Sequence, residues 1–216
     1  MNYKKKYFHI ENLSAEKIAK KYGTPTYCYS YDKIKNNIKK FKSFFSTINP
    51  LICFSIKSNN NLFILREIKK LGLGADVVSQ GELMRALKAG INPKKIVFSG
   101  VGKTEEEIRM AINKNVLLIN VESENELDLI NKISKKSAKK ISIGIRLNPN
   151  ISAKTHKKIS TGSRDEKFGL TYSDFVNLCY KLKKMKNLNL LGISVHIGSQ
   201  ITNVEPFKKV LFVIKK

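Results

Sequence analysis

Residues 74–83 read GADVVSQGEL, and this short stretch carries the pattern that decides the fold class. Its first half is apolar apart from Asp76, as is typical of a strand that a parallel sheet buries on both faces. Its second half fits the S/T-x-x-E capping box, in which Ser79 and Glu82 bind free backbone N–H groups at the start of a helix. The stretch therefore predicts a β-strand that leads directly into an α-helix.

The same strand–helix unit recurs along the chain at nearly regular intervals. Capping boxes also begin at Thr104 and Ser123. Apolar runs end near six positions, namely Lys57, Ser79, Gly100, Ser123, Asn148 and Ser199. Alternating strands and helices predict an α/β fold with a parallel sheet, either open or closed into a barrel. A (β/α)8 barrel needs eight strands, so six of them predict an incomplete one.

The N-terminal residues follow a different pattern. A helix is predicted near residues 14–22, where Gly23 and Pro25 end it. We therefore expect an N-terminal segment, residues 1–30, in which a helix and a strand lead into a barrel domain at residues 31–216. The first ten residues lack the apolar stretch of a secretory signal, and no apolar run reaches the ~18 residues of a membrane span. We expect a cytoplasmic location and no membrane partner.

The composition is globular but strongly basic. Apolar residues make up 42% of the 216 residues, and the formal net charge is +24. Such a charge can indicate a nucleic-acid partner, but the lysines are spread along every predicted helix and form no single stripe. The excess fits a general enrichment of lysine on solvated faces, so we expect no nucleic-acid partner. Tight, salt-dependent binding to DNA would overturn that expectation.

Three cysteines, Cys28, Cys53 and Cys179, are scattered without paired spacing. They match neither a zinc site nor a disulfide framework, and they fit a reducing compartment. We therefore expect three reduced thiols and no metal centre.

The predicted carboxyl ends of the strands carry polar and titratable residues. These are Lys57, Asp76 with Ser79, Lys103, Glu122, Arg146 with Asn148, His196 and Ser199. In βα folds, ligands bind at this end of the strands, so we expect these side chains to share one rim of the sheet. Their convergence is more informative than any one of them.

Lys57 closes the apolar run of CFSIKSN, residues 53–59, and has two interpretations. It is either a strand-end lysine whose stem covers apolar surface or a nucleophile that the scaffold holds in place. His196 is ambiguous as well, because a strand histidine is more often hydrogen-bonded in a core than catalytic. Gly198 and Ser199 can offer N–H groups and a hydroxyl to an anion.

Several motifs together resemble one enzyme family. FSIKSN, GADVVSQGEL and HIGSQ resemble the first, second and sixth barrel strands of the fold-type III pyridoxal-phosphate decarboxylases. The segment NPNISAKTHKKISTG, with EKFGL after it, resembles the loop of the diaminopimelate decarboxylases rather than that of the ornithine or arginine enzymes. IVFSGVGKTEEEI and INVESENEL are also similar to that family. The resemblance covers about residues 22–210, and its motifs occur in the family's order.

The resemblance implies a (β/α)8 TIM-type barrel of the alanine racemase and decarboxylase type, with pyridoxal 5'-phosphate as cofactor. It implies that Lys57 binds the cofactor covalently, that His196 stacks on its ring and that Ser199 contacts its phosphate. Asp76 and Arg146 match family positions close to the cofactor. The implied reaction is the decarboxylation of meso-2,6-diaminopimelate to L-lysine, the last step of lysine biosynthesis, by a homodimer.

The resemblance also predicts what this chain lacks. Family members continue with a Gly-rich phosphate loop, an acid that pairs with the pyridine nitrogen, and a C-terminal β-domain. None of these occurs before Lys216, so we expect about six of eight strands and little or no CO2 release by the isolated chain. The alternatives are another fold-type III decarboxylase, acting on ornithine or arginine, and a non-catalytic barrel that binds pyridoxal phosphate.

Overall fold

The structure is a computed structural model that describes residues 2–4, 6–151 and 168–215. The chain divides into two compact units, residues 1–51 and 52–216, and each is described by itself. The domain boundary expected after residue 30 falls inside the first of these units, at the start of its second helix. The polar stretch that resembles the diaminopimelate decarboxylase loop lies mostly at 152–167, outside the described residues.

The first unit contains a small antiparallel sheet and two helices. Its strands lie in the order β1 (Asn2–Lys4), β2 (Tyr7–Ile10) and β3 (Leu13–Ser14), and its helices are α1 (Ala15–Tyr22) and α2 (Tyr31–Ser43). The predicted first helix is confirmed, because Ser14 caps its first turn and Gly23, with φ of 80°, ends it. The sequence did not predict the three-stranded sheet before it.

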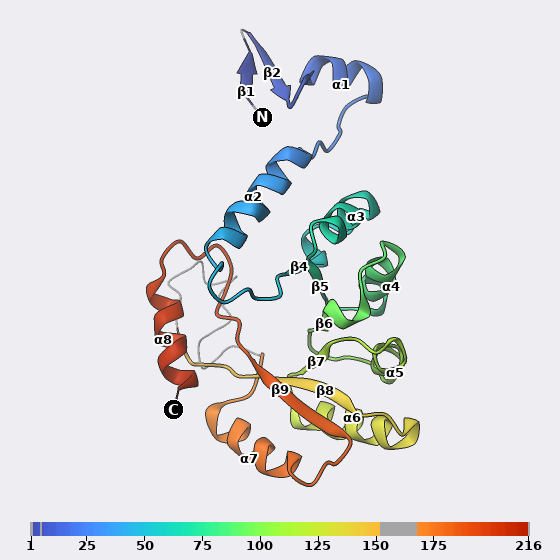
Figure 1. Cartoon of the computed structure of the whole chain (residues 1–216), viewed down its shortest axis with the longest axis vertical. Coiled ribbons are helices and arrows are strands. Elements are labelled where there is room, and N and C mark those ends of the chain that lie inside the picture. The colour runs from blue at the N-terminus through green and yellow to red at the C-terminus, as the bar shows by residue number, and fades with distance from the viewer. Residues whose placement is uncertain (1, 5, 152–167, 216) are drawn as a thin grey trace. The chain divides into compact units, whose positions relative to one another are not determined.

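The second unit is built on a six-stranded parallel sheet (Figure 1). Its strands follow the chain order β4 (Cys53–Ser55), β5 (Gly74–Val77), β6 (Ile96–Phe98), β7 (Leu118–Val121), β8 (Ile141–Arg146) and β9 (Leu188–Ser194). Each strand pairs with the next, and in the described residues β9 does not pair back to β4. The parallel α/β sheet of an incomplete barrel is therefore confirmed.

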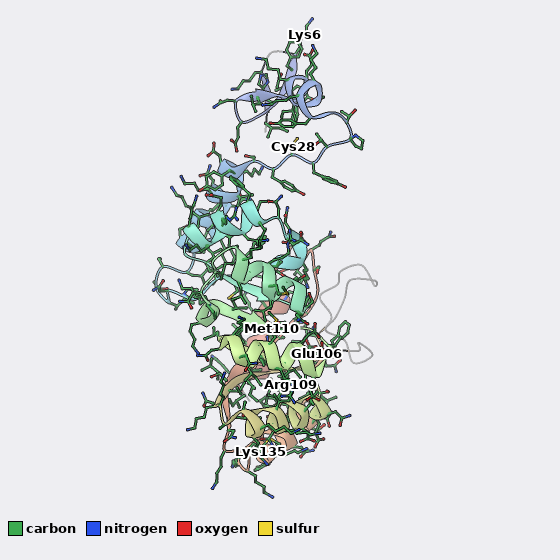
Figure 2. The ribbon with its side chains drawn as sticks, turned by 90° about the vertical axis from the view of Figure 1, so that its right-hand side faces the viewer. Lys6, Cys28, Glu106, Arg109, Met110 and Lys135 are labelled. Atoms are coloured by element: carbon green, nitrogen blue, oxygen red, sulfur yellow. The ribbon has the colours of Figure 1, made fainter. Side chains whose placement is uncertain are left out.

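A helix follows each strand. These helices are α3 (Leu62–Lys70), α4 (Gln80–Lys88), α5 (Glu105–Lys114), α6 (Glu124–Ser137), α7 (Tyr172–Leu182) and α8 (Glu205–Ile214), with single 3-10 turns η1 (Ile56–Ser58) and η2 (Pro93–Lys95). Helices α3 to α7 contribute side chains to the main hydrophobic cluster beside the sheet, whereas α8 packs in a separate small cluster. Figure 2 shows part of this helix layer from outside, with the exposed Glu106 of α5 and Lys135 of α6 labelled.

The predicted capping boxes begin three of these helices. Thr104 and Glu107 form the complete reciprocal pair at α5. At α4, Ser79 accepts from the Glu82 N–H at 3.2 Å, but the Glu82 carboxylate accepts from the Val78 N–H, one residue earlier than in the standard box. The same variation occurs at α6. The glutamate therefore fastens the end of the preceding strand to the helix, which fixes the strand–helix corner.

Two strand ends differ from those predicted. Lys57 does not lie on a strand, because β4 stops at Ser55 and Lys57 is the central residue of η1. His196 and Ser199 lie beyond the end of β9 at Ser194. These short additions place the side chains above the sheet, on the loops that follow it, as is usual for ligand-binding residues in βα folds.

Successive side chains along each strand point to opposite faces of the sheet. One face packs in the hydrophobic core, and the other lines the pocket. Ala75 and Val77 are fully buried in the main hydrophobic cluster, which is rich in Ile and Leu. The intervening Asp76 faces the other way. Asn120 of β7 pairs in register with Gly144 of β8 and lies on the same inner side as Asp76. The outer face therefore packs against helices, and the inner face carries polar groups.

Some of the lysines lie at the C-terminal ends of helices. The last turns of the helices of the second unit contain Lys69, Lys70, Lys88, Lys114, Lys135, Lys136 and Lys181. Cations there interact favourably with the partial negative charge of the helix end. Acidic residues lie instead in the first turns, as in α5 and α6. Helix electrostatics therefore accounts for the position of these lysines.

All three cysteines are free thiols, as predicted. Burial, with a smaller contribution from the Asp76 carboxylate, raises the pKa of the Cys53 thiol to about 11, so this thiol stays protonated. Within the described ranges, no group of three His, Cys, Asp or Glu side chains could hold a metal ion. No helix in those ranges is long and apolar enough to cross a membrane.

Gly144 and Gly192 form a matched pair for testing the inner packing of the sheet, because they are register partners on β8 and β9. A Cβ at Gly144 would collide with the Asn120 Oδ1 atom, whereas a Cβ at Gly192 would meet nothing within 4 Å. We expect Gly144→Ala to lower the free energy of unfolding by about 1–3 kcal/mol. Urea denaturation measures this change.

The control is Gly192→Ala, which we expect to leave the stability within about 1 kcal/mol of the parent. Both substitutions add the same methyl group to neighbouring strands. Equal effects of the two would contradict the assigned packing of Asn120 against Gly144.

Candidate functional site

The carboxyl ends of the six parallel strands surround a pocket of about 380 Å³, a volume typical of small-molecule sites. It is lined by Lys57, Asp76, Val78, Ser99, Gly100, Val101, Asn120, Glu122, Arg146, Phe168, Ser194, Val195 and His196. Four of the five predicted site residues are therefore brought together. Ser199, the fifth, is exposed and does not line the pocket.

Lys57 reaches the pocket from the turn η1. The fully buried Ile56 anchors this turn, and the Ser58 hydroxyl closes it by donating to the Ser55 carbonyl at 2.7 Å. The Lys57 side chain is exposed, and within the described residues its amine makes no hydrogen bond or ion pair. The scaffold thus holds the backbone of Lys57 and leaves its amine available to a ligand.

Asp76 belongs to a chain of hydrogen bonds across the ends of four strands, β4 to β7. Its Oδ1 atom accepts from the Ser99 hydroxyl at 2.5 Å, and its Oδ2 atom accepts weakly from the Ser55 hydroxyl at 3.4 Å. The Asn120 amide donates to Ser99 Oγ at 3.0 Å. Because both carboxylate oxygens and the serine hydroxyl are engaged, the Asp76 side chain has a fixed direction in the pocket.

Arg146, at the end of β8, is held from two sides. Its Nη1 atom donates to Glu122 Oε2 at 2.8 Å, in a pair whose glutamate side chain is only 3% exposed. Its guanidinium carbon lies 5.5 Å from the centre of the Phe168 ring, within range of a cation–π interaction. The Glu122 Oε1 atom accepts from the Gly100 N–H at 3.0 Å, which fixes the glutamate in turn. A positive charge is therefore positioned at the pocket wall.

His196 lies at the mouth of the pocket, and its pKa is lower than that of a free histidine. The largest cause is partial desolvation of the ring, followed by the positive charges of Arg146 and Lys57. Asp76 and Glu122 act in the opposite direction and reduce the shift. Uncharged imidazole is therefore favoured near neutral pH, and an uncharged ring can lie flat against an aromatic ligand.

Two of the polar strand-end residues, Ser79 and Lys103, do not line the pocket. Ser79 is the N-cap of α4. Lys103, which we expected at the same rim, is buried, with a side chain only 1% exposed. Lys103 is therefore not available to a ligand.

Sequence reasoning missed several lining residues, above all Ser99, Asn120, Phe168 and Ser194. Ser99 follows the predicted strand end at KIVFSG and could have been found by reading one residue further along each strand. Asn120 and Ser194 occupy inward positions within strands. Their polar type inside an apolar run was a usable signal, because polar residues there need partners.

The comparisons with known proteins agree with this geometry. The family described as "Pyridoxal-dependent decarboxylase, pyridoxal binding domain" matches residues 31–215. The chain belongs to this family. The matched region starts at the residue where we placed the start of the barrel domain, and the match confirms the resemblance inferred from the sequence motifs.

Two of the similar curated proteins are diaminopimelate decarboxylases. The chain is 42% identical over 200 residues to diaminopimelate decarboxylase of Aquifex aeolicus, covering 93% of this chain and 47% of that protein. It is 46% identical over 191 residues to diaminopimelate decarboxylase of Helicobacter pylori strain J99, covering 88% of this chain and 47% of that protein. The chain thus spans about half the length of the curated relatives it matches.

Solved structures give the same result. The structure of Helicobacter pylori diaminopimelate decarboxylase complexed with L-lysine matches with a TM-score of 0.89 and 44% identity, covering 93% of this chain and 52% of that one. The M. jannaschii diaminopimelate decarboxylase in complex with L-lysine matches with a TM-score of 0.89 and 39% identity, covering 98% and 51%. The cofactor of the family is pyridoxal phosphate, and the fold of this chain is that of its barrel.

The pocket residues fit this cofactor, which carries an aldehyde, an aromatic ring and a phosphate. The Lys57 amine has no protein partner in the described residues and suits the aldehyde. Arg146 and Lys57 give the pocket cations that attract a phosphate or a carboxylate. Ser194 Oγ is buried in the wall without a hydrogen-bond partner in the described part of the chain. An unsatisfied buried hydroxyl is costly, and a polar ligand would satisfy it.

Arg146→Gln tests the electrostatics of the pocket. We expect the pKa of His196 to rise by roughly 0.5–1 pH unit, because the substitution removes a nearby positive charge and leaves Glu122 unpaired. Histidine ring signals, followed by NMR across a pH titration, measure the shift. The chain has only 3 histidines, so the signals are readily assigned.

The control is Arg109→Gln, which removes an arginine that pairs with Glu105 on the surface of α5. We expect this variant to leave the pKa of His196 unchanged. A fall in the His196 pKa with Arg146→Gln, or an equal shift in both variants, would show that Arg146 does not act on His196.

Proposed function

We propose that this chain supplies the pyridoxal-binding part of a diaminopimelate decarboxylase, which converts meso-2,6-diaminopimelate to L-lysine and CO2. The observation that carries the proposal is the meeting of Lys57, Asp76, Arg146 and His196 in one pocket of a chain 46% identical to a diaminopimelate decarboxylase. Two of the similar solved enzymes are complexes with L-lysine, the product of the proposed reaction.

In this proposal Lys57 is the lysine that holds the cofactor covalently. Its amine must be free of protein partners to react with an aldehyde, and no partner is seen in the described residues. Its backbone must not move, and the turn η1 is closed by the Ser58 hydrogen bond and anchored by Ile56. The chemistry that pyridoxal 5'-phosphate supplies when bound is an electron sink for the pair left on the amino acid as CO2 departs.

The other pocket residues bind and orient. His196 offers a largely uncharged ring for stacking, because its pKa is lowered by desolvation and by the neighbouring cations. Arg146 holds a positive charge against the wall, where Glu122 and Phe168 fix its position. The Asp76 carboxylate is oriented by Ser99. These groups are fixed before any ligand arrives, so binding requires little reorganisation.

Ser194 and Ser199 have different parts in the proposal. The Ser194 hydroxyl, buried and without a partner in the described residues, becomes a hydrogen-bonding contact for the ligand. Ser199 is proposed as a phosphate contact on the strength of the HIGSQ motif alone, since it lies on the exposed loop after β9. Ser199 would reach the ligand only if this loop folds over the pocket.

We also propose that the protein acts as a homodimer in the cytoplasm and has no nucleic-acid partner. The dimer is inferred from the family resemblance, and the location from the three free thiols. The position of many lysines in the last turns of helices supports a structural origin of the charge. Sedimentation at several protein concentrations tests the homodimer. Titration with DNA at two salt concentrations tests the proposed absence of a nucleic-acid partner.

Borohydride trapping tests the proposed role of Lys57. The chain is incubated with pyridoxal 5'-phosphate, reduced, digested and mapped by mass spectrometry. We expect Lys57 to be labelled at cofactor concentrations that leave other lysines unlabelled, because Lys57 lies in the pocket at the strand ends together with Arg146 and His196. Lys57→Ala should abolish this saturable labelling.

Lys88→Ala is the matched control, because Lys88 is an exposed lysine in the last turn of α4, away from the pocket. It should leave the labelling unchanged. Labelling of Lys57 to no greater extent than Lys88 would refute the assignment of Lys57.

The substrate is tested separately on the cofactor-loaded chain. We expect meso-diaminopimelate to change the cofactor's absorbance at lower concentration than L-ornithine or L-arginine. CO2 release from the three amino acids is measured in parallel. A preference for ornithine or arginine would favour the alternative decarboxylases, and no response to any amino acid would favour a non-catalytic binding protein.

A further inference from the structure

Lys103 is a buried lysine that lies behind the pocket and contacts no ligand surface. Its Nζ atom donates to Glu126 Oε1 at 2.6 Å, to the Asn120 carbonyl at 2.7 Å and to the Gly100 carbonyl at 2.5 Å. Three acceptors match the three N–H donors of an ammonium group. Lys103 therefore ties together the ends of β6 and β7 and the first turn of α6.

These contacts close into a ring of four residues. Lys103 donates to Gly100, whose N–H donates to Glu122 Oε1. The Glu122 N–H donates to Glu126 Oε2, and Glu126 accepts from Lys103 with its other oxygen. The structure thus contains a closed circuit, named here the Lys103 ring, in which each member restrains the next.

The Lys103 ring is hydrogen-bonded to two groups of pocket residues, the Glu122–Arg146 ion pair and the chain of Asn120, Ser99 and Asp76. Glu122, a ring member, accepts from Arg146 at 2.8 Å. Asn120, whose carbonyl accepts from Lys103, extends its amide to Ser99 and through it to Asp76. Lys103 and Arg146 balance the charges of Glu122 and Glu126, so removal of one cation leaves an excess of negative charge beside the pocket.

We propose that Lys103 is a positioning residue, which acts through Glu126 and Glu122 to hold the Arg146 guanidinium at the pocket wall. Replacing a whole buried ion pair by apolar residues often costs little net stability, so the pair of Lys103 and Glu126 is not explained by stability alone. The geometry gives the lysine a more specific role. Its acceptors Gly100 and Glu126 also bind Glu122, which holds Arg146, and its acceptor Asn120 binds Ser99, which holds Asp76. The cofactor-binding consequence rests on the proposed function, whereas the effect on Arg146 does not.

Lys103→Met tests the proposal without any cofactor. Four charged groups act on His196, namely Arg146 of β8, Lys57 of η1, Asp76 of β5 and Glu122 after β7. Without Lys103, the two ring carboxylates are left with Arg146 as their cation and draw it back from the pocket. The withdrawal of Arg146 from the pocket raises the His196 pKa, by roughly 0.5 pH unit in an NMR titration.

Lys181→Met is the matched control. Lys181 also bonds two carboxylates, Glu124 and Asp128 of the same helix α6, but it does so on the surface. We expect no change in the His196 titration with this variant. An unchanged His196 pKa in folded Lys103→Met would overturn the proposal and leave Lys103 a structural residue.

The double variant Lys103→Met, Glu126→Gln covers the case in which the single variant fails to fold. It removes both charges of the buried pair and leaves no lone charge. The Gly100 and Asn120 carbonyls still lose their shared donor, so we expect a folded protein in which the His196 pKa is raised, though less than in the single variant. A folded double variant with the parent His196 pKa would contradict the proposal.

Cofactor affinity provides the second readout. We expect the double variant to bind pyridoxal 5'-phosphate about threefold to thirtyfold more weakly than the parent, the range typical of coupled network residues. Unchanged affinity, where the parent binds, would contradict the proposed influence of Lys103 on binding. If the parent does not bind the cofactor, the proposed function fails, while the His196 titration still decides the role of Lys103.

Discussion

The site depends on one constraint, the unbroken parallel pairing of β4 to β9 in chain order. Parallel strands must all run the same way, so their carboxyl ends meet at one edge. The chain places a polar residue at or just beyond most of these ends, and residues as distant in sequence as Lys57 and His196 therefore line one pocket. The capping glutamates maintain this arrangement, because Glu82 and Glu126 each bind the backbone of the preceding strand end.

Much of this arrangement was predictable from the sequence. The strand–helix alternation identified all six parallel strands, because apolar runs and capping boxes are local signals. The helix starts at Ser79, Thr104 and Ser123 were predicted for the same reason. Four of five site residues reached one pocket because the parallel topology determines which ends converge. Convergence at one rim is therefore the part of the site that the sequence predicted.

The remaining features depend on contacts that no local pattern contains. The sequence placed Lys103 at the ligand rim, but three acceptors from different segments draw its ammonium group into the interior. Ser99 and Asn120 matter because they meet Asp76 across strands, and only the register determines that meeting. The turn η1 also escaped prediction, because a single 3-10 turn, closed by the Ser58 hydroxyl and the Asn59 N–H, leaves no periodic pattern in the sequence. The partners of Asp76 on β6, and those of Lys103 on β7 and α6, lie too far along the chain for spacing to reveal them.

The central claim is that this strand edge forms a pyridoxal-phosphate pocket with Lys57 as its covalent attachment point. The most direct test is a crystal structure of the chain after incubation with pyridoxal 5'-phosphate and reduction. We predict continuous electron density from Lys57 Nζ into the pocket, with the cofactor ring beside His196 and polar contacts to Arg146 or Ser194. Cofactor density attached to a different lysine, or a pocket that stays empty while surface lysines are modified, would contradict the account.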